Sequence, residues 1–108
     1  MQLTVSVTEG VYVLQQEEII CLEASSNYTR LHLTGQRNIF SAKTLKEYES
    51  MLPQNNFYRV HSAYLINTKH ICHISPTGKI GLSQNISVHI SKRRKTRIKS
   101  LLKQIGLM

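Results

Sequence analysis

Four consecutive basic side chains, Lys92-Arg93-Arg94-Lys95, form the strongest chemical signal in this 108-residue sequence. A guanidinium pairs with phosphate through two parallel hydrogen bonds, and it bonds the O6 and N7 atoms of guanine in the same way. Positive side chains at the start of a helix oppose the helix dipole, so helix stability does not explain this run. A phosphate bound to the free amide groups there would explain it, with solvated surface charge as the alternative.

The segment Ala24 to Tyr28 joins an apolar stretch to an alternating one. Asn27 can donate to and accept from the edge of an adenine, while Tyr28 and Arg30 flank it for phosphate contact. An ordinary connection with a local Asn turn explains the same residues equally well.

The stretch from Phe57 to Asn67 has the spacing of a protein core, yet polar residues including Arg59, His61 and Ser62 interrupt it. A buried, hydrogen-bonded His61 that fixes the bend before Leu65 would account for its position without any ligand. Contact with a partner is the other interpretation, and the residues alone leave both open.

The charge of the chain is unevenly distributed. Lys and Arg total 14 against six Glu and no Asp, which gives a net charge of +8. Residues 1–49 carry all six Glu and four basic residues, whereas residues 50–108 carry ten basic residues and no acid. A half without a single carboxylate indicates an anionic partner, and we expect nucleic acid ahead of lipid headgroups or acidic proteins.

Catalytic chemistry is not expected. Without Asp, the chain lacks a phosphoacceptor Asp, a Ser-His-Asp triad and any Asp-based metal site. It also lacks HExxH and a Gly-rich phosphate loop. His70 and His73 would lie on opposite faces of a strand and could not share a metal. We therefore predict a protein that is not an enzyme and has no cofactor or metal.

The sequence predicts a cytoplasmic protein of one domain. It has no apolar run near the roughly 18 residues that a membrane span requires, and no basic segment of a signal peptide precedes Thr8. Cys21 and Cys72 lie in apolar stretches without CxxC spacing, so we expect both to be buried, reduced thiols.

Short strands should position these groups. Alternation at period two marks residues 28–33, and the turn 34–36 leads to a strand over 38–41, which predicts a hairpin. Further apolar runs predict strands at 11–14 and 19–22, near 65–66, and at 71–74, 80–82 and 86–90. The sequence therefore favours a mostly β architecture.

Two helices interrupt this pattern. Thr44 and Glu47 have capping-box spacing, which predicts a helix over 45–51 that turns Leu45, Tyr48 and Leu52 toward the core. A second helix should begin after Ser91, with the Ser91 hydroxyl as its cap. Its apolar stripe would consist of residues spaced three and four apart: Ile98, Leu101, Leu102 and Ile105.

Taken in order, these motifs resemble the LytTR DNA-binding domain family, the output module of many bacterial response regulators. The matching residues are Ile20-Cys21-Leu22-Glu23-Ala24 with Asn27-Tyr28, Thr44 to Glu47 with Leu52-Pro53, Phe57, Arg59, His61 with Ile66-Asn67, and Ile90-Ser91-Lys92-Arg93-Arg94. The resemblance covers roughly residues 10–103, and residues 1–9 would be an N-terminal extension or a first edge strand. Ala63 departs from the pattern, because the family usually carries Ser there, and these 108 residues do not include the receiver domain common in the family.

The resemblance implies an elongated, antiparallel fold of three small β-sheets with short helices over residues 10–108. It also implies that loops and strand ends enter successive major grooves of double-stranded DNA. Base-reading candidates are Asn27 or Thr29, Ser62 and Arg93, and candidates for phosphate contact are Tyr28, Arg30, Lys92, Arg94, Lys95 and Arg97. Arg59 and His61 either contact DNA or support their loop from behind.

Several partners follow from the resemblance: promoter repeats, a second copy on paired half-sites, and a receiver domain if the chain is part of a longer response regulator. No membrane partner is expected. The alternative is a module that docks on anionic membranes or acidic proteins through the basic C-terminal helix.

Overall fold

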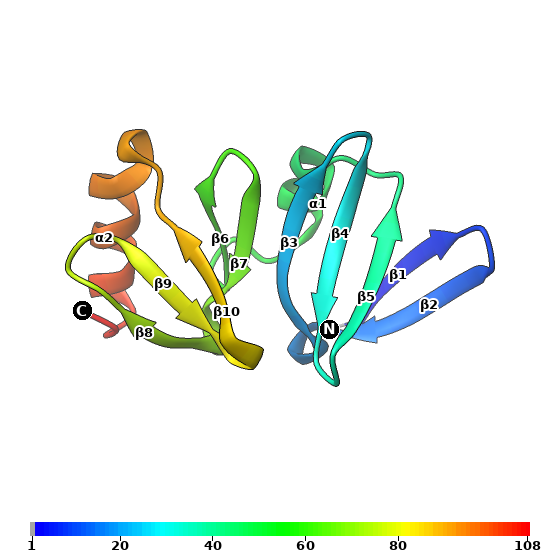
Figure 1. The fold of residues 1–108 in the computed structure, drawn as a ribbon, viewed down its shortest axis with the longest axis horizontal. Helices are drawn as coiled ribbons and strands as arrows, with labels where there is room; N and C mark the ends of the chain where they lie inside the picture. Colours follow the sequence, from blue (N-terminus) through cyan, green and yellow to red (C-terminus); the bar gives the residue numbers. More distant parts are fainter. Residues whose placement is uncertain (1) are drawn as a thin grey trace.

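The computed structural model describes residues 2–108, which form an elongated body of 41 × 24 × 23 Å. Within those residues, ten strands make three antiparallel sheets, as predicted (Figure 1). The elements are β1 (Gln2–Val7), β2 (Gly10–Gln15), η1 (Gln16–Glu18), β3 (Ile19–Ser25), β4 (Tyr28–Leu33), β5 (Arg37–Ser41), α1 (Leu45–Met51), β6 (Phe57–His61), β7 (Tyr64–Asn67), η2 (Thr68–His70), β8 (Ile71–Ile74), β9 (Lys79–Leu82), η3 (Ser83–Asn85), β10 (Ile86–His89), η4 (Lys92–Arg94) and α2 (Lys95–Gln104).

The central sheet has the strand order β5-β4-β3-β7-β6. The predicted hairpin is confirmed, since β4 pairs with β5 in antiparallel register. Strand β6 was not among the predicted strands, because Arg59 and His61 break its apolar pattern. It nevertheless pairs with β7, with an irregularity in register between Arg59 and His61.

Both faces of β3 are buried, which explains its unbroken apolar run. Ile19 and Leu22 join a core with α1 and the hairpin β1–β2. Ile20 and Cys21 join a second core with the sheet β10-β9-β8 and α2. A strand covered on both sides cannot alternate between apolar and polar residues. Figure 1 shows the resulting order, with α2 at one end of the long axis and β1–β2 at the other.

The helix and the capping box predicted for residues 44–51 are confirmed in α1. The Thr44 hydroxyl accepts a hydrogen bond from the Glu47 amide at 3.1 Å, and the Glu47 carboxylate accepts one from the Thr44 amide at 2.6 Å. Each partner satisfies an amide that the helix itself leaves unbonded. Leu45, Tyr48 and Leu52 are all buried.

The predicted Ser91 cap is wrong. The 3-10 helix η4 precedes α2, and the Arg94 amide donates to the Ser91 carbonyl at 3.1 Å. The Ser91 hydroxyl is buried and makes no hydrogen bond. Because the tight turn satisfies the amide through the Ser91 backbone, α2 begins at Lys95 instead of directly after Ser91.

Two further expectations need correction. The first expectation was a stripe on α2 that includes Ile105. Ile98 and Leu102 are buried, but Ile105 is 42% exposed and follows the end of α2 at Gln104. Cys21 is buried, whereas Cys72 is exposed on β8, an edge strand of its sheet. Residues 2–7 form the strand β1, which pairs with β2.

Candidate nucleic-acid interface

Three segments that are distant in the sequence meet along one edge of the molecule. The Ala24 amide donates to the Ala63 carbonyl at 2.9 Å, which joins the end of β3 to the β6–β7 turn. The Ser91 amide donates to the Val60 carbonyl at 2.9 Å, which joins β6 to the entry of η4. We call residues 26–28, 61–63 and 92–95 the loop edge, which runs along the top of Figure 1, roughly parallel to the longest axis.

The β3–β4 turn has two central residues, Ser26 and Asn27, between the paired residues Ser25 and Tyr28. Ser26 has a φ of +52°, a left-handed conformation that two-residue hairpin turns often require. Asn27 is exposed, and Tyr28 is 54% exposed. Both predicted contacts therefore stand on the surface, beside one another.

Thr29 does not join them. Its side chain is fully buried, and its hydroxyl donates to the Lys43 carbonyl at 2.7 Å. The alternation along β4 turns Thr29 inward with Leu31 and Leu33, so it cannot reach a partner without unfolding the strand. The prediction that Thr29 reads a base is not retained.

Arg30 lies on the outer face of the central sheet rather than in the turn. Its Nε donates to the Asn38 side-chain oxygen at 3.1 Å, and its guanidinium lies 5.7 Å from the centre of the Phe40 ring. Stacking on an aromatic ring holds a guanidinium in place while leaving some of its N–H groups available.

The β6–β7 turn is held by Arg59. Its Nε donates to the His61 carbonyl at 3.1 Å, and its Nη2 donates to the Ser62 carbonyl at 2.6 Å. Its Nη1 bonds the Glu49 carboxylate at 2.8 Å, which anchors the guanidinium to α1. We call this set of contacts the Arg59 clamp. Of the two roles considered for Arg59, the geometry favours support of the loop.

His61 also takes part in the turn. Its Nδ1 accepts a hydrogen bond from the Ala63 amide at 3.1 Å, and its ring meets Tyr64 edge-to-face, with centroids 5.8 Å apart. Ser62 is exposed at the tip. The turn thus exposes the Ser62 hydroxyl, and hydrogen bonds between its backbone and the Arg59 and His61 side chains hold it in place.

The basic run adds cations to the same edge. Lys92, Arg93 and Arg97 are exposed, whereas Arg94 and Lys95 are half-buried. Gly78 allows the Lys95 stem to pack close to the β8–β9 turn, because a Cβ at Gly78 would lie 2.9 Å from the Lys95 Cε. Arg93 is therefore more exposed than Arg94 and Lys95.

Sequence reasoning missed two residues at this edge. Lys43 is exposed beside the β3–β4 turn, because the Thr29 hydroxyl holds its carbonyl there. Glu49 is the anchor of the Arg59 clamp. Nothing in the local sequence marks either one, since each contact joins residues at least ten positions apart. Among residues 2–108, no group of three His, Cys, Asp or Glu could hold a metal, and no helix is long and apolar enough to cross a membrane.

Comparisons with known proteins identify a matching family model, similar sequences and a similar fold. The family model of the LytTr DNA-binding domain matches residues 9–103. The Transcriptional regulatory protein LytR of Staphylococcus aureus (strain N315) is 33% identical over 69 residues, which cover 64% of this chain and 28% of that protein. The Sensory transduction protein LytR of Staphylococcus epidermidis is 28% identical over 97% of this chain and 42% of its own length.

A solved LytTr DNA-binding domain from Bacillus cereus has the same fold. Its TM-score is 0.83 at 23% identity, and the match covers 94% of this chain and 95% of that one. The chain spans less than half the length of the curated relatives it matches. The family model covers most of the chain, and the relatives support DNA binding in transcription regulation. This chain belongs to the LytTR DNA-binding domain family.

Proposed function

We propose that the loop edge binds double-stranded DNA in a sequence-specific manner and that the chain serves as the output domain of a bacterial response regulator. The observation that supports this most is the meeting of two exposed polar turns and the basic run 92–95 on one edge. The two turns carry an amide and a hydroxyl, and the basic run carries guanidinium groups; these are groups that read base edges in a major groove.

Each side chain has a part in this proposal. Asn27, Ser62 and Arg93 read bases, because they are exposed at the tips of their segments. The Arg59 clamp and His61 position the β6–β7 turn. The phosphate contacts that set the register are Tyr28, Arg30, Lys43, Lys92, Arg94, Lys95 and Arg97.

The wider setting belongs to the same proposal. The matched relatives are more than twice as long as this chain, which leaves room for a receiver domain. We place the domain in the cytoplasm, on promoter repeats that two copies occupy together, without a cofactor or a catalytic role. Docking on a membrane through α2 is not favoured, because Ile98 and Leu102 of its stripe are buried against the sheets.

The experiment is selection of bound duplexes from a random pool, followed by titration of the enriched site. Six neutralised phosphates, one for each Lys or Arg among the proposed phosphate contacts, would give a slope of log K against log salt near about −5.4. Arg93→Ala should cost about 1–3 kcal/mol and relax discrimination at one base pair. Lys79→Ala, an exposed cation on β9 outside the loop edge, is the matched control. A pool without enrichment would contradict the proposal.

A further inference from the structure

The central sheet ends in an open strand edge at β5. Among residues 2–108, β5 pairs only with β4. Adjacent residues of an antiparallel strand direct their backbone groups to opposite neighbours. Tyr28 closes the two-residue β3–β4 turn and faces β3, so the next residue, Thr29, faces its partner Ser41 on β5. On β5 itself, Asn38 and Phe40 therefore direct their N–H and C=O groups outward, to the open edge.

Nothing in β5 protects this edge. Exposed strand edges are usually blocked by a proline, a bulge, a lysine or a very short strand. Strand β5 has five residues, no proline and a continuous register with β4. Its one charged residue is Arg37, at its start, whose guanidinium bonds the Glu18 carboxylate at 2.8 Å. The edge is thus free to pair with another strand.

The apolar layer beneath the sheet continues past this edge. In the hairpin β1–β2, Val5 is fully buried in the core that also contains Ile39. Tyr12 is the register partner of Val5, and Val7 lies two residues further along, so both share its face. Yet Tyr12 is 41% exposed and Val7 only half-buried, because the hairpin projects beyond β5 (Figure 1). We call Val7 and Tyr12 the hairpin floor.

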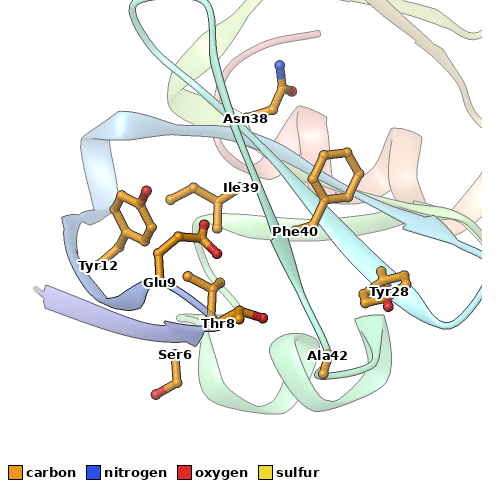
Figure 2. Close-up of a pocket in the computed structure, with 10 residues that line it drawn as sticks. Ser6, Thr8, Glu9, Tyr12, Tyr28, Asn38, Ile39, Phe40 and Ala42 are labelled. Carbon is orange, nitrogen blue, oxygen red and sulfur yellow. The ribbon is translucent and has the colours of Figure 1, made fainter.

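An open groove of about 760 Å³ lies beside β5, between residues 38–40 and residues 6–9 of the hairpin. A strand in a packed sheet occupies about 160 Å³ per residue, so this volume suits about four or five residues. Figure 2 shows Glu9 and Tyr12 on one side of the groove and Phe40 and Tyr28 on the other. Of the described residues that line it, none is Lys or Arg, and the one acid is Glu9.

The chemistry of the occupant follows from these walls. A strand added antiparallel to β5 would place alternate side chains over the hairpin floor, where apolar groups fit. The side chains between them would lie on the outer face with Phe40. Among residues 2–108, Glu9 forms no ion pair, so a basic side chain there would gain a partner.

We infer that β5 receives an extended segment of a partner protein, with alternating apolar and basic residues, as an added antiparallel strand. Main-chain hydrogen bonds to Asn38 and Phe40 supply affinity, and the hairpin floor with Glu9 supplies specificity. These residues lie outside the loop edge, so binding of the segment can be tested without DNA. Because Tyr28 lines the groove and also belongs to the loop edge, the docked segment lies next to the proposed DNA surface.

The probe is a five-residue peptide that alternates three valines with two lysines, blocked at both ends and labelled with fluorescein. Its anisotropy is titrated with the 108-residue chain. N-methyl groups on both lysines remove the donors that face β5 and keep the charge. They should weaken binding about 25-fold, because two hydrogen bonds are lost and each contributes about fivefold. N-methyl groups on two valines should change little. Equal effects of the two modifications, or no binding of the unmodified peptide, would overturn the inference.

Variants of the chain test the same contacts. Asn38→Pro removes one outward donor at a position where an edge strand tolerates proline, and it should weaken binding about fivefold. Asn38→Ala keeps that donor and should bind as the unmodified chain does. A peptide with glutamates in place of lysines should bind about two- to fivefold more weakly, and Glu9→Lys should reverse this preference.

A second copy of the chain is the competing occupant of the edge. Sedimentation of the chain alone should show a monomer. A dimer that Asn38→Pro dissociates would overturn the partner segment in favour of pairing between copies. If Asn38→Pro does not fold by circular dichroism, the two methylated peptides still decide between strand pairing and adsorption through side chains.

Discussion

Replacing Arg59 by Ala should reduce recognition of the specific site far more than general affinity for DNA. The variant removes two hydrogen bonds that hold the His61 and Ser62 carbonyls, together with the Glu49 ion pair. The released turn can no longer present Ser62 in one orientation, although no cation that contacts phosphate has been removed in our proposal.

The magnitude follows from the exposure of the clamp. The Arg59 and Glu49 side chains are 18% and 39% exposed, so their ion pair contributes at most about 1 kcal/mol. Hydrogen bonds to charged groups contribute about 1.5–3 kcal/mol when buried, and we take half of that for carbonyls beside solvent. Two such hydrogen bonds and the ion pair together give an expected fall in the free energy of unfolding of about 1.5–4 kcal/mol. Loss of one ordered base contact should cost another 1–3 kcal/mol of specific binding, about 5- to 150-fold.

The assays are urea unfolding and fluorescence anisotropy with the selected duplex and a scrambled one. Arg59→Lys should rescue little, because one ammonium cannot bond two carbonyls and a carboxylate in the geometry of a planar guanidinium. Glu49→Gln should have a small effect, since it removes only the ion pair. Equal losses on both duplexes, with a shallower salt slope, would refute the reasoning and make Arg59 a direct phosphate contact.

Three further predictions concern stability and reactivity. Thr29→Val should lower the free energy of unfolding by about 1–3 kcal/mol in a urea titration, because it leaves the part-buried Lys43 carbonyl without its donor. Because the same bond holds Lys43, the folded variant should lose affinity equally for the selected and the scrambled duplex. Burial raises the pKa of Cys21 to about 12. A thiol reagent at pH 8 should therefore modify only Cys72 in the folded protein, and both thiols in urea. Two reactive thiols in the folded protein would contradict the burial of Cys21. Partial burial raises the pKa of Glu23, but hydrogen bonds from His32 and Tyr64 outweigh it and leave the pKa below its ordinary value of 4.5. The stabilisation by ionised Glu23 is therefore complete above that value and is lost as the pH falls through the folded pKa, so Glu23→Gln should flatten the acid limb of unfolding measured by circular dichroism.

Local sequence was sufficient for elements whose stability comes from near neighbours. The helix α1 follows from Thr44 and Glu47, because both partners of the capping box lie within one turn. The hairpin β4–β5 follows from alternation around a short turn. The basic run at Lys92 was also visible, since cations at a helix start have no local explanation.

Tertiary structure decided where these groups stand. The Ala24–Ala63 and Ser91–Val60 hydrogen bonds join residues about 30 to 40 positions apart, and no local pattern encodes such pairs. For the same reason, the sequence left the role of Arg59 open until Glu49 and the turn carbonyls were in place. Thr29 is buried, and its hydroxyl bonds the Lys43 carbonyl just after the neighbouring strand β5, a contact that the local sequence did not reveal. The sequence by itself determined which side chains could bind an anion, and the pairing of distant strands determined which of them share an edge.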